Sequence, residues 1–247
     1  MTGARRNPFA SAEVAGAYDA WFESPLGATV DRLEKRLIAR LAAPRAGQSA
    51  LDVGTGTGHY AAYLDDLGLR VTGIDASPAM LEVARARPSD VAWQEGDVAA
   101  LPYPADSFDL VLSVTMLEFV PDPAAALAEM YRVLRPGGRL VAAVLNARSP
   151  WGRARQREAL EADTPFRRAH FFQPGEFASL LGRLGQAEWS SAVFLGPYGG
   201  GLRYADLVER LGQAFWRGRG ALLVGRVSKG TGAARLALII HWRCRPI

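Results

Sequence analysis

The chain has 247 residues, of which 49% are hydrophobic and 22% are charged, and this length and composition fit one globular α/β domain with elaborations. A single cysteine excludes an intrachain disulfide framework and a cysteine-based metal site, and the lack of a long apolar run excludes a membrane span, so we expect a cytoplasmic protein without a bound metal. The net charge of +4 comes mostly from arginines scattered among acidic residues, which is a weak indication of nucleic-acid binding.

Residues 1–47 are predicted to form a helical cap. Apolar side chains recur at helical spacing from Thr29 to Ala42 with charged residues between them, which predicts an amphipathic helix that ends near Pro44. An aromatic cluster, Tyr18-Asp19-Ala20-Trp21-Phe22, precedes this helix. Its rings either belong to the hydrophobic core or form a lid over a bound ligand, and both interpretations stay open.

The most informative stretch runs from Leu51 to Tyr60, with the sequence Leu-Asp-Val-Gly-Thr-Gly-Thr-Gly-His-Tyr. Its first residues predict the end of a buried strand, and a helix is predicted from Tyr60 to Leu67. Glycines at alternate positions allow a tight turn and let a ligand approach the backbone, close to the free N–H groups of the helix. We therefore predict a site for a nucleoside-like ligand. Two alternatives remain here: a dinucleotide site, since Gly56-x-Gly58-x-x-Ala61 fits that pattern, and a purely structural turn.

The next strand, predicted from Leu69 to Ile74, ends in Asp75, which follows the glycine-rich turn by about 20 residues. Because neighbouring parallel strands end at the same edge of a sheet, Asp75 is expected beside the turn. A carboxylate in this place can accept hydrogen bonds from both ribose hydroxyls of an adenosine. Ser77 and Pro78 then predict the start of a helix that continues to Arg87.

A longer pattern follows a short strand predicted from Val91 to Trp93. It consists of Gly96-Asp97, Leu101-Pro102-Tyr103 and Ser107-Phe108-Asp109, and it leads into a strand from Leu110 to Val114. Together with Asp52-x-Gly54-x-Gly56-x-Gly58, this pattern resembles class I S-adenosylmethionine-dependent methyltransferases of the small-molecule type, similar to those of ubiquinone and menaquinone biosynthesis. Dinucleotide folds have no counterpart to it. The resemblance covers residues 18–145 well and the remainder loosely.

This resemblance implies a fold, a cofactor and a set of site residues. The fold is a doubly wound, Rossmann-like α/β sheet of seven strands in the order 3-2-1-4-5-7-6, and the cofactor is S-adenosylmethionine. In the family, Asp52 helps to position the loop, Asp97 accepts a hydrogen bond from the adenine amine, and Met80 and Val98 face the adenine. The cofactor-binding residues that the resemblance implies are Tyr18, Trp21, Asp52, Gly54, Thr55, Gly56, Gly58, Asp75, Ala76, Met80, Asp97, Val98 and Thr115.

The remainder of the chain predicts further elements of the same single domain. Residues 48–145 are expected to form the cofactor-binding core, and residues 146–247 to add substrate-side elaborations and the last strands. Predicted helices cover residues 121–134, 151–162 and 204–216, and predicted strands cover residues 140–145, 187–195, 221–227 and 236–242. The helix at 151–162 is expected to be an insertion after strand five, and Arg135-Pro136-Gly137-Gly138 a turn before that strand. Which of the last two strands is antiparallel stays open.

The resemblance implies in-line transfer of a methyl group to an O, N or C atom of a small, partly apolar acceptor. Alignment alone supplies on the order of 7–11 kcal/mol, so a general base is not obligatory. If one exists, Glu118, His170 and Tyr198 are candidates by residue type, and each also suits a structural role. Many relatives carry a His-His or similar pair where this chain has Leu117-Glu118, which leaves the base unassigned.

Three other functions stay open. An NAD-binding oxidoreductase would need a Tyr-x-x-x-Lys pair or a hydride-site histidine, and we find neither in a chain whose only lysines are Lys35 and Lys229. An RNA methyltransferase would agree with the excess of basic residues, and a non-catalytic protein could bind the cofactor as a sensor. We expect a small-molecule acceptor rather than nucleic acid as the partner, and a monomer or a homodimer.

Overall fold

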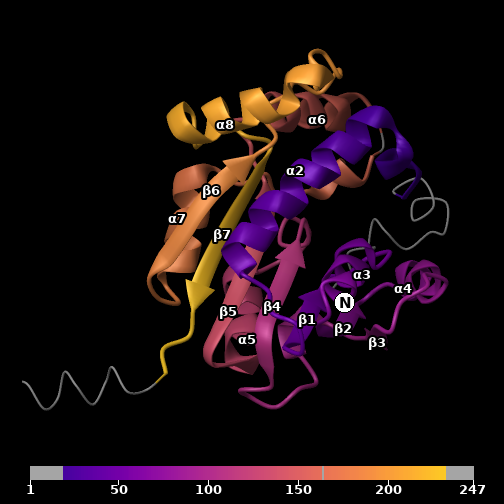
Figure 1. The fold of residues 1–247 in the computed structure, drawn as a ribbon, viewed down its shortest axis with the longest axis vertical. Coiled ribbons are helices and arrows are strands. Elements are labelled where there is room, and N and C mark those ends of the chain that lie inside the picture. Colours follow the sequence, from indigo (N-terminus) through magenta and orange to yellow (C-terminus); the bar gives the residue numbers. More distant parts are fainter. Residues whose placement is uncertain (1–18, 163, 232–247) are drawn as a thin grey trace, which may run out of the picture.

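A seven-stranded sheet forms the centre of the computed structural model, which describes residues 19–162 and 164–231 (Figure 1). The strand order is β3-β2-β1-β4-β5-β7-β6, which confirms the doubly wound fold that the resemblance implied. Neighbouring strands are parallel except at β7, which pairs antiparallel with both β5 and β6. The strands are β1 Ser49–Val53, β2 Arg70–Asp75, β3 Ala92–Glu95, β4 Phe108–Val114, β5 Leu134–Leu145, β6 Ala187–Ala192 and β7 Leu222–Ser228.

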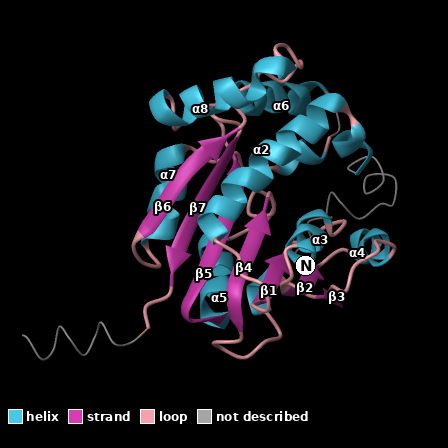
Figure 2. Cartoon of the chain, in the orientation of Figure 1, coloured by secondary structure: helices cyan, strands magenta, loops and turns pink. Residues whose placement is uncertain are grey.

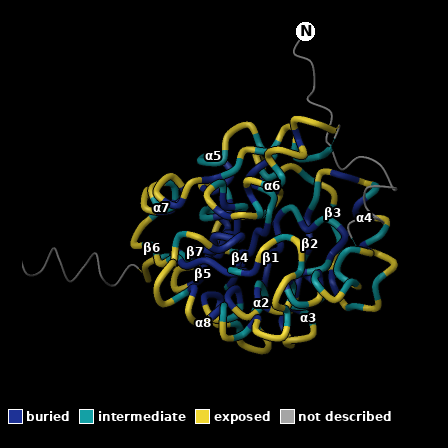
Figure 3. The backbone as a smooth tube through the Cα atoms, turned by 90° about the horizontal axis from the view of Figure 1, so that it is seen from above, coloured by how far each residue is buried: buried dark blue, intermediate teal, exposed yellow. Residues whose placement is uncertain are grey.

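Helices cover both faces of this sheet, and the central strands are the most buried part of the chain (Figure 2, Figure 3). α2, α3 and α8 lie on one face, and α5 and α7 lie on the other. Because both faces are covered, the central strands are nearly continuous apolar runs. The helices are α2 Pro25–Ala42, α3 His59–Asp66, α4 Pro78–Arg85, α5 Pro123–Val133, α6 Pro150–Glu161, α7 Pro174–Gly182 and α8 Ala205–Phe215, with the short 3-10 helices η1 Val98–Ala100, η2 Pro165–Arg168 and η3 Leu202–Tyr204.

Helix α2 begins at Pro25, earlier than the apolar periodicity predicted. Ser24 is its N-cap: the side-chain oxygen accepts a hydrogen bond from the Gly27 N–H at 3.0 Å, and Pro25 occupies the first helical position. The helix ends at Ala42, and Ala43 then adopts a left-handed conformation with φ of 42°. A local Ser-Pro signal therefore decides where the helix begins, and periodicity does not.

Strand β5 begins at Leu134, directly after α5, and thus earlier than predicted. Its pairing with β4 changes register between Phe108 and Leu110, opposite the Arg-Pro-Gly-Gly segment. Gly137 has a φ of 80°, and residues 135–137 are exposed while the strand on either side of them is buried. The expected turn before the strand is therefore wrong, because these residues form an irregularity inside the strand.

The antiparallel strand of the sheet is β7, which corresponds to the strand predicted at 221–227. The other candidate, residues 236–242, lies outside the described residues. After β5 the chain inserts α6 and η2, and α6 lies beyond the carboxyl ends of the parallel strands (Figure 1). No helix in residues 19–162 or 164–231 is long and apolar enough to cross a membrane.

Candidate functional site

The glycine-rich turn between β1 and α3 borders a cavity. Gly54, Gly56 and Gly58 have φ values of 70°, 55° and 79°. A Cβ atom on Gly58 would lie 2.4 Å from the ring of Trp93, so packing alone requires glycine there. A Cβ atom on Gly56 would meet no described atom within 4 Å, although Gly56 lines the cavity. Gly56 is thus the position where the missing side chain leaves the backbone open to a ligand.

Asp75 ends β2 beside this turn and organises the backbone around it. Its Oδ2 accepts a hydrogen bond from the Gly56 N–H at 2.8 Å, and its Oδ1 accepts one from the Ser77 N–H at 2.8 Å. Burial raises the pKa of Asp75, and these backbone donors act in the opposite direction. Since each carboxylate oxygen can accept two hydrogen bonds, Asp75 can hold the turn and also accept hydrogen bonds from a ligand.

Asp52 lies in β1, directly before the glycine-rich turn, and forms a hydrogen bond with a residue of that turn. The side chain is almost fully buried, and its Oδ2 accepts a hydrogen bond from the Thr55 hydroxyl at 2.6 Å. Burial raises the pKa of Asp52 to about 7; the nearby charge of Asp75 contributes to the rise, and the Thr55 hydrogen bond opposes it. The Asp52 carboxyl therefore fixes the loop through its hydrogen bond with Thr55.

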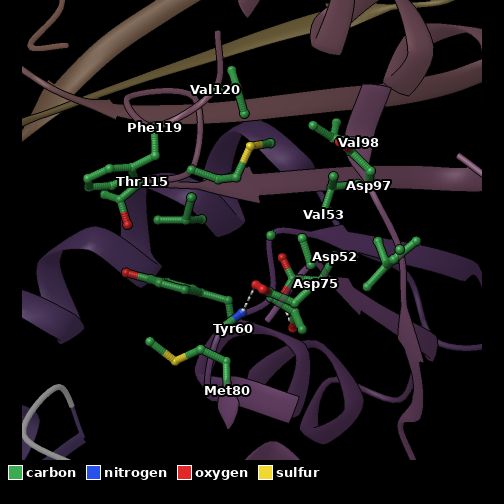
Figure 4. Close-up of a pocket in the computed structure, with 18 of the residues that line it drawn as sticks. Asp52, Val53, Tyr60, Asp75, Met80, Asp97, Val98, Thr115, Phe119 and Val120 are labelled. Atoms are coloured by element: carbon green, nitrogen blue, oxygen red, sulfur yellow. Dashed lines mark hydrogen bonds between the residues drawn. The ribbon is translucent and has the colours of Figure 1, made fainter. Parts of the chain in front are cut away.

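A cavity of about 710 Å³ lies over the turn, at the carboxyl ends of β1, β2 and β4. This volume is in the range of small-molecule and cofactor sites. Figure 4 shows Asp97 and Val98 on one side of the cavity, Thr115 and Phe119 on the other, and Asp75 between them. Ten of the residues expected to bind the cofactor line it: Asp52, Gly54, Thr55, Gly56, Asp75, Ala76, Met80, Asp97, Val98 and Thr115.

Other lining residues were not among those expected to bind the cofactor, although the segment that ends β4 was expected to face the acceptor side. They are Val53, Thr57, His59, Tyr60, Ile74, Gly96, Val114, Met116, Phe119, Val120, Pro121 and Arg168. His59 and Tyr60 directly follow the glycine-rich turn, so their place next to the motif could have indicated them. Arg168 comes from η2, in the insertion after β5, and no local pattern indicates that it reaches the cavity.

Three residues expected to bind the cofactor are not among the described lining residues. Gly58 packs against Trp93, and Tyr18 lies outside the described residues. Trp21 is half-buried against the core on the α2 face of the sheet, with its ring centroid 6.3 Å from that of Trp151 in an edge-on contact. These contacts suit a core residue, and the lid role of Tyr18 and Trp21 stays a prediction.

Asp19 ties the N-terminal part of the described chain to the glycine-rich turn. Its Oδ1 accepts a hydrogen bond from the Thr57 hydroxyl at 2.6 Å, and its Oδ2 pairs with the Arg87 guanidinium at 2.5 Å. The Arg87 Nε also donates to the Thr57 carbonyl at 2.6 Å. This network joins α2's leading segment, the turn and the end of α4, and it fixes Thr57 at the cavity wall.

The first two residues of α3 form hydrogen bonds with carboxylates of α2. His59 Nε2 lies 2.6 Å from Asp31 Oδ1, and the Tyr60 hydroxyl donates to Glu34 Oε2 at 2.8 Å. Tyr60 lines the cavity, and Figure 4 shows its hydroxyl on the side where Thr115 lies. The hydrogen bond therefore connects Glu34 to that side of the cavity.

Glu34 is surrounded by charges from several helices. Burial is the largest influence and raises the pKa of Glu34 to about 7, with further contributions from the negative charges of Asp31 and of Glu209 in α8. The hydrogen bond from Tyr60 and the positive charge of Arg155 in α6 act in the opposite direction. A carboxyl with a raised pKa that is hydrogen-bonded to Tyr60 suits a proton acceptor.

None of the three residues considered as a general base is among the described lining residues. Glu118 is 1% exposed, its Oε1 accepts a hydrogen bond from the Leu145 N–H at 2.6 Å, and burial raises its pKa to about 8. His170 lies at the surface with Nε2 2.6 Å from Glu176 Oε1, and Tyr198 is 89% exposed. Among the described residues, no group of three or more His, Cys, Asp or Glu side chains could hold a metal ion.

Comparison with known proteins agrees with this geometry. Residues 51–142 match the methyltransferase domain family, and this range contains the glycine-rich turn, Asp75 and the loop after β4. The crystal structure of an S-adenosylmethionine-dependent methyltransferase from Thermotoga maritima superposes with a TM-score of 0.67 at 25% identity, covering 88% of this chain and 97% of that one. In its fold and in residues 51–142, this chain is similar to the class I S-adenosylmethionine-dependent methyltransferases.

Two curated proteins that are similar to this chain carry different names. Malonyl-[acyl-carrier protein] O-methyltransferase from Serratia marcescens is 35% identical over 140 residues, which are 57% of this chain and 52% of that protein. Demethylmenaquinone methyltransferase from Renibacterium salmoninarum is 40% identical over 131 residues, which are 53% of this chain and 55% of that protein. The chain therefore spans about half the length of the curated relatives it matches.

Proposed function

We propose that this chain transfers a methyl group from S-adenosylmethionine to a small, partly apolar molecule. The observation that carries the proposal is the position of the Asp75 carboxylate next to the open backbone of Gly56, at the edge of the 710 Å³ cavity. A nucleoside fits this combination, because the carboxylate accepts hydrogen bonds from ribose hydroxyls and the bare backbone allows close approach. The match of residues 51–142 to the methyltransferase domain family supports S-adenosylmethionine as the source of this nucleoside.

The residues around the turn fit this cofactor. We assign the ribose hydroxyls to Asp75, the adenine amine to Asp97, and the adenine ring to Met80 and Val98, which line the same cavity. When bound, S-adenosylmethionine supplies an electrophilic methyl group. The chain contributes alignment, a cavity wall that excludes water, and, where the acceptor must lose a proton, a group that takes it.

The acceptor is placed on the side of the cavity opposite Asp97. Val114, Met116, Phe119 and Val120 line the cavity with apolar side chains, which favours an acceptor with an apolar part. Arg168 lines the same cavity and adds one positive charge, which favours an electronegative group on the acceptor. The two curated relatives are named for different acceptors, so they support methyl transfer without selecting one molecule.

Calorimetry is expected to show that the purified chain binds S-adenosylmethionine or S-adenosylhomocysteine and has no comparable affinity for NAD. A reversed ranking would contradict the methyltransferase proposal.

A metabolite extract incubated with labelled cofactor should then yield one labelled small molecule. Cofactor binding without any labelled product would favour a sensor, and salt-sensitive labelling of RNA would favour an RNA acceptor.

Asp75→Ala is expected to raise the Kd for S-adenosylhomocysteine about ten- to hundredfold. A hydrogen bond to a charged group contributes about 1.5–3 kcal/mol, and the substitution removes the carboxylate assigned to the ribose. Calorimetry gives the Kd, and the melting temperature shows whether the turn survives the loss of the Gly56 hydrogen bond.

Asp109→Ala is the matched control for this substitution. Asp109 lies at the opposite end of the sheet, where its Oδ2 accepts a hydrogen bond from the Ser49 N–H at 2.8 Å and pairs with Arg135. This variant should lose stability and keep the affinity. An unchanged Kd in a folded Asp75→Ala protein would exclude Asp75 as the ribose ligand.

A further inference from the structure

Helix α8 carries an apolar stripe on its outer side. Five of the eight large hydrophobic residues that are exposed in the described part of the chain lie in or beside this helix, and they are Tyr204, Leu207, Leu211, Phe215 and Trp216. The first four recur every three or four residues and therefore share one face of the helix. Phe215 is 73% exposed and Trp216 is 59% exposed. The side of α8 that packs on the protein consists instead of Ala205, Glu209 and Gly212.

The charges of α8 are divided between its two sides. Asp206 accepts hydrogen bonds from Arg32 and Arg36 of α2 at 2.8 and 2.7 Å. Glu209 is buried and accepts a hydrogen bond from the Val193 N–H at 3.0 Å. Arg210 in α8 and three arginines that flank the helix are exposed and form no ion pair with a described residue; the flanking ones are Arg203, Arg219 and Arg217, whose guanidinium lies over the Trp189 ring. The outer surface of the helix is therefore apolar and positively charged.

The combination of exposed apolar residues and arginines favours an anionic lipid bilayer over a second copy of the chain as the partner of this face. In a symmetric dimer built on this face, the same arginines of the two copies would meet, and like charges oppose such an interface. The surface of an anionic bilayer is complementary, because its acidic headgroups attract arginines and its acyl region accepts leucine and phenylalanine. Tyr204 and Trp216 have the amphipathic rings that are enriched at the boundary between headgroups and acyl chains.

We propose that the outer face of α8 docks the protein on the surface of an anionic lipid bilayer. The helix lies in the plane of the surface, with Leu207, Leu211 and Phe215 among the acyl chains and the arginines at the headgroups. β6 runs parallel to β5, so α8, which follows β6, lies at the edge of the sheet where the parallel strands end and the cavity opens (Figure 1). On the basis of the proposed function, docking brings the acceptor side of the cavity close to a membrane that concentrates apolar molecules.

The test is sedimentation of the full chain with vesicles of phosphatidylcholine alone and with added phosphatidylglycerol. We expect at least tenfold tighter binding to the vesicles that contain phosphatidylglycerol, and weaker binding at high salt. The double substitution Leu211→Gln and Phe215→Ser should weaken this binding at least tenfold. The substitution Arg210→Ser should weaken it roughly fivefold, since one basic residue near an anionic surface contributes about 1 kcal/mol.

Matched controls come from the other end of the sheet. Leu67, an exposed leucine after α3, and Arg70, an exposed arginine at the start of β2, are replaced by Gln and Ser and should leave vesicle binding unchanged. Three results would overturn the proposal: equal binding to both kinds of vesicle, unchanged binding of the α8 variants, or a dimer in gel filtration that the Leu211 and Phe215 substitutions dissociate. Calorimetry with S-adenosylhomocysteine on the same samples tests the cofactor site separately, so a failure of docking is not confused with a failure of the proposed function.

Discussion

Glu34→Gln is expected to slow methyl transfer to a hydroxyl acceptor by about 10²- to 10⁴-fold, which is the usual contribution of a positioned proton acceptor. The proposed step moves two protons: the acceptor hydroxyl gives its proton to the Tyr60 oxygen as Tyr60 gives its own to Glu34 Oε2. Tyr60 lines the cavity and donates to Glu34 at 2.8 Å, which is the geometry that the transfer from Tyr60 to Glu34 requires. Glutamine can still accept the Tyr60 hydrogen bond but cannot take up the proton.

The pH dependence of the rate tests whether Glu34 takes up the proton. Glu34 takes up a proton only as the carboxylate, and burial raises its pKa to about 7. The wild-type rate should therefore rise through about pH 7 and level off above it, and Glu34→Gln should remove this rise. The charges that set the pKa come from Asp31, Glu209 and Arg155, so the midpoint belongs to the cluster as a whole.

Tyrosine variants supply the control. Tyr60→Phe should lower the maximal rate to a similar degree as Glu34→Gln and leave the Kd of S-adenosylhomocysteine unchanged. Tyr103→Phe removes a hydroxyl that donates to Gln94 at 2.7 Å, away from the described lining of the cavity, and should leave both quantities unchanged. A pH profile that is identical in the wild type and in Glu34→Gln would exclude Glu34 as the proton acceptor. A labelled product identified from the extract provides the acceptor for these measurements.

Local patterns sufficed to predict most of the strands and the place of Asp75 beside the turn, whereas the order of the strands followed from the family resemblance. One strand, one tight turn and one helix bring the chain back beside itself, so Asp75 had to lie next to the glycine-rich turn. Strand β7 was also expected from its apolar run, and only its direction needed the structure. Where local signals competed, as at Ser24-Pro25 and in the Arg135–Gly138 segment, hydrogen bonds and pairing with β4 set the boundary.

Contacts between residues that are far apart in the chain could not be predicted from the spacing of residues in the sequence. The Tyr60–Glu34 bond joins residues 26 apart, and the Asp19–Arg87 pair joins residues 68 apart. Helix α8 shows a second limit of prediction from sequence. Its periodicity predicts an amphipathic helix but does not indicate which side of the helix faces the core. In the structure, Glu209 is buried because it caps the backbone after β6, and Phe215 is left at the surface.

Glu118 provides a test of the structure that needs no acceptor. The side chain is 1% exposed, Oε1 accepts a hydrogen bond from the Leu145 N–H, and Oε2 has no hydrogen-bond partner among the described residues. Burial raises the pKa of Glu118 from 4.5 to about 8, so the folded protein keeps this proton at pH values where the unfolded chain has released it. The stability that the neutral carboxyl provides is complete below pH 4.5 and is lost as the pH rises toward 8.

Glu118→Gln is therefore expected to gain stability relative to the wild type as the pH rises. The shift corresponds to on the order of 5 kcal/mol in the free energy of unfolding, most of it lost by the wild type between about pH 5 and pH 8. Glutamine keeps an acceptor for the Leu145 N–H and cannot ionise, and comparing the two proteins at each pH cancels the contributions of Asp52 and Glu34. Urea unfolding measures the difference, and Glu188→Gln at an exposed site in β6 is the control, for which the difference should stay nearly constant. A difference between wild type and Glu118→Gln that does not change with pH would mean that Glu118 is ionised in the folded protein and that water or another donor reaches its Oε2.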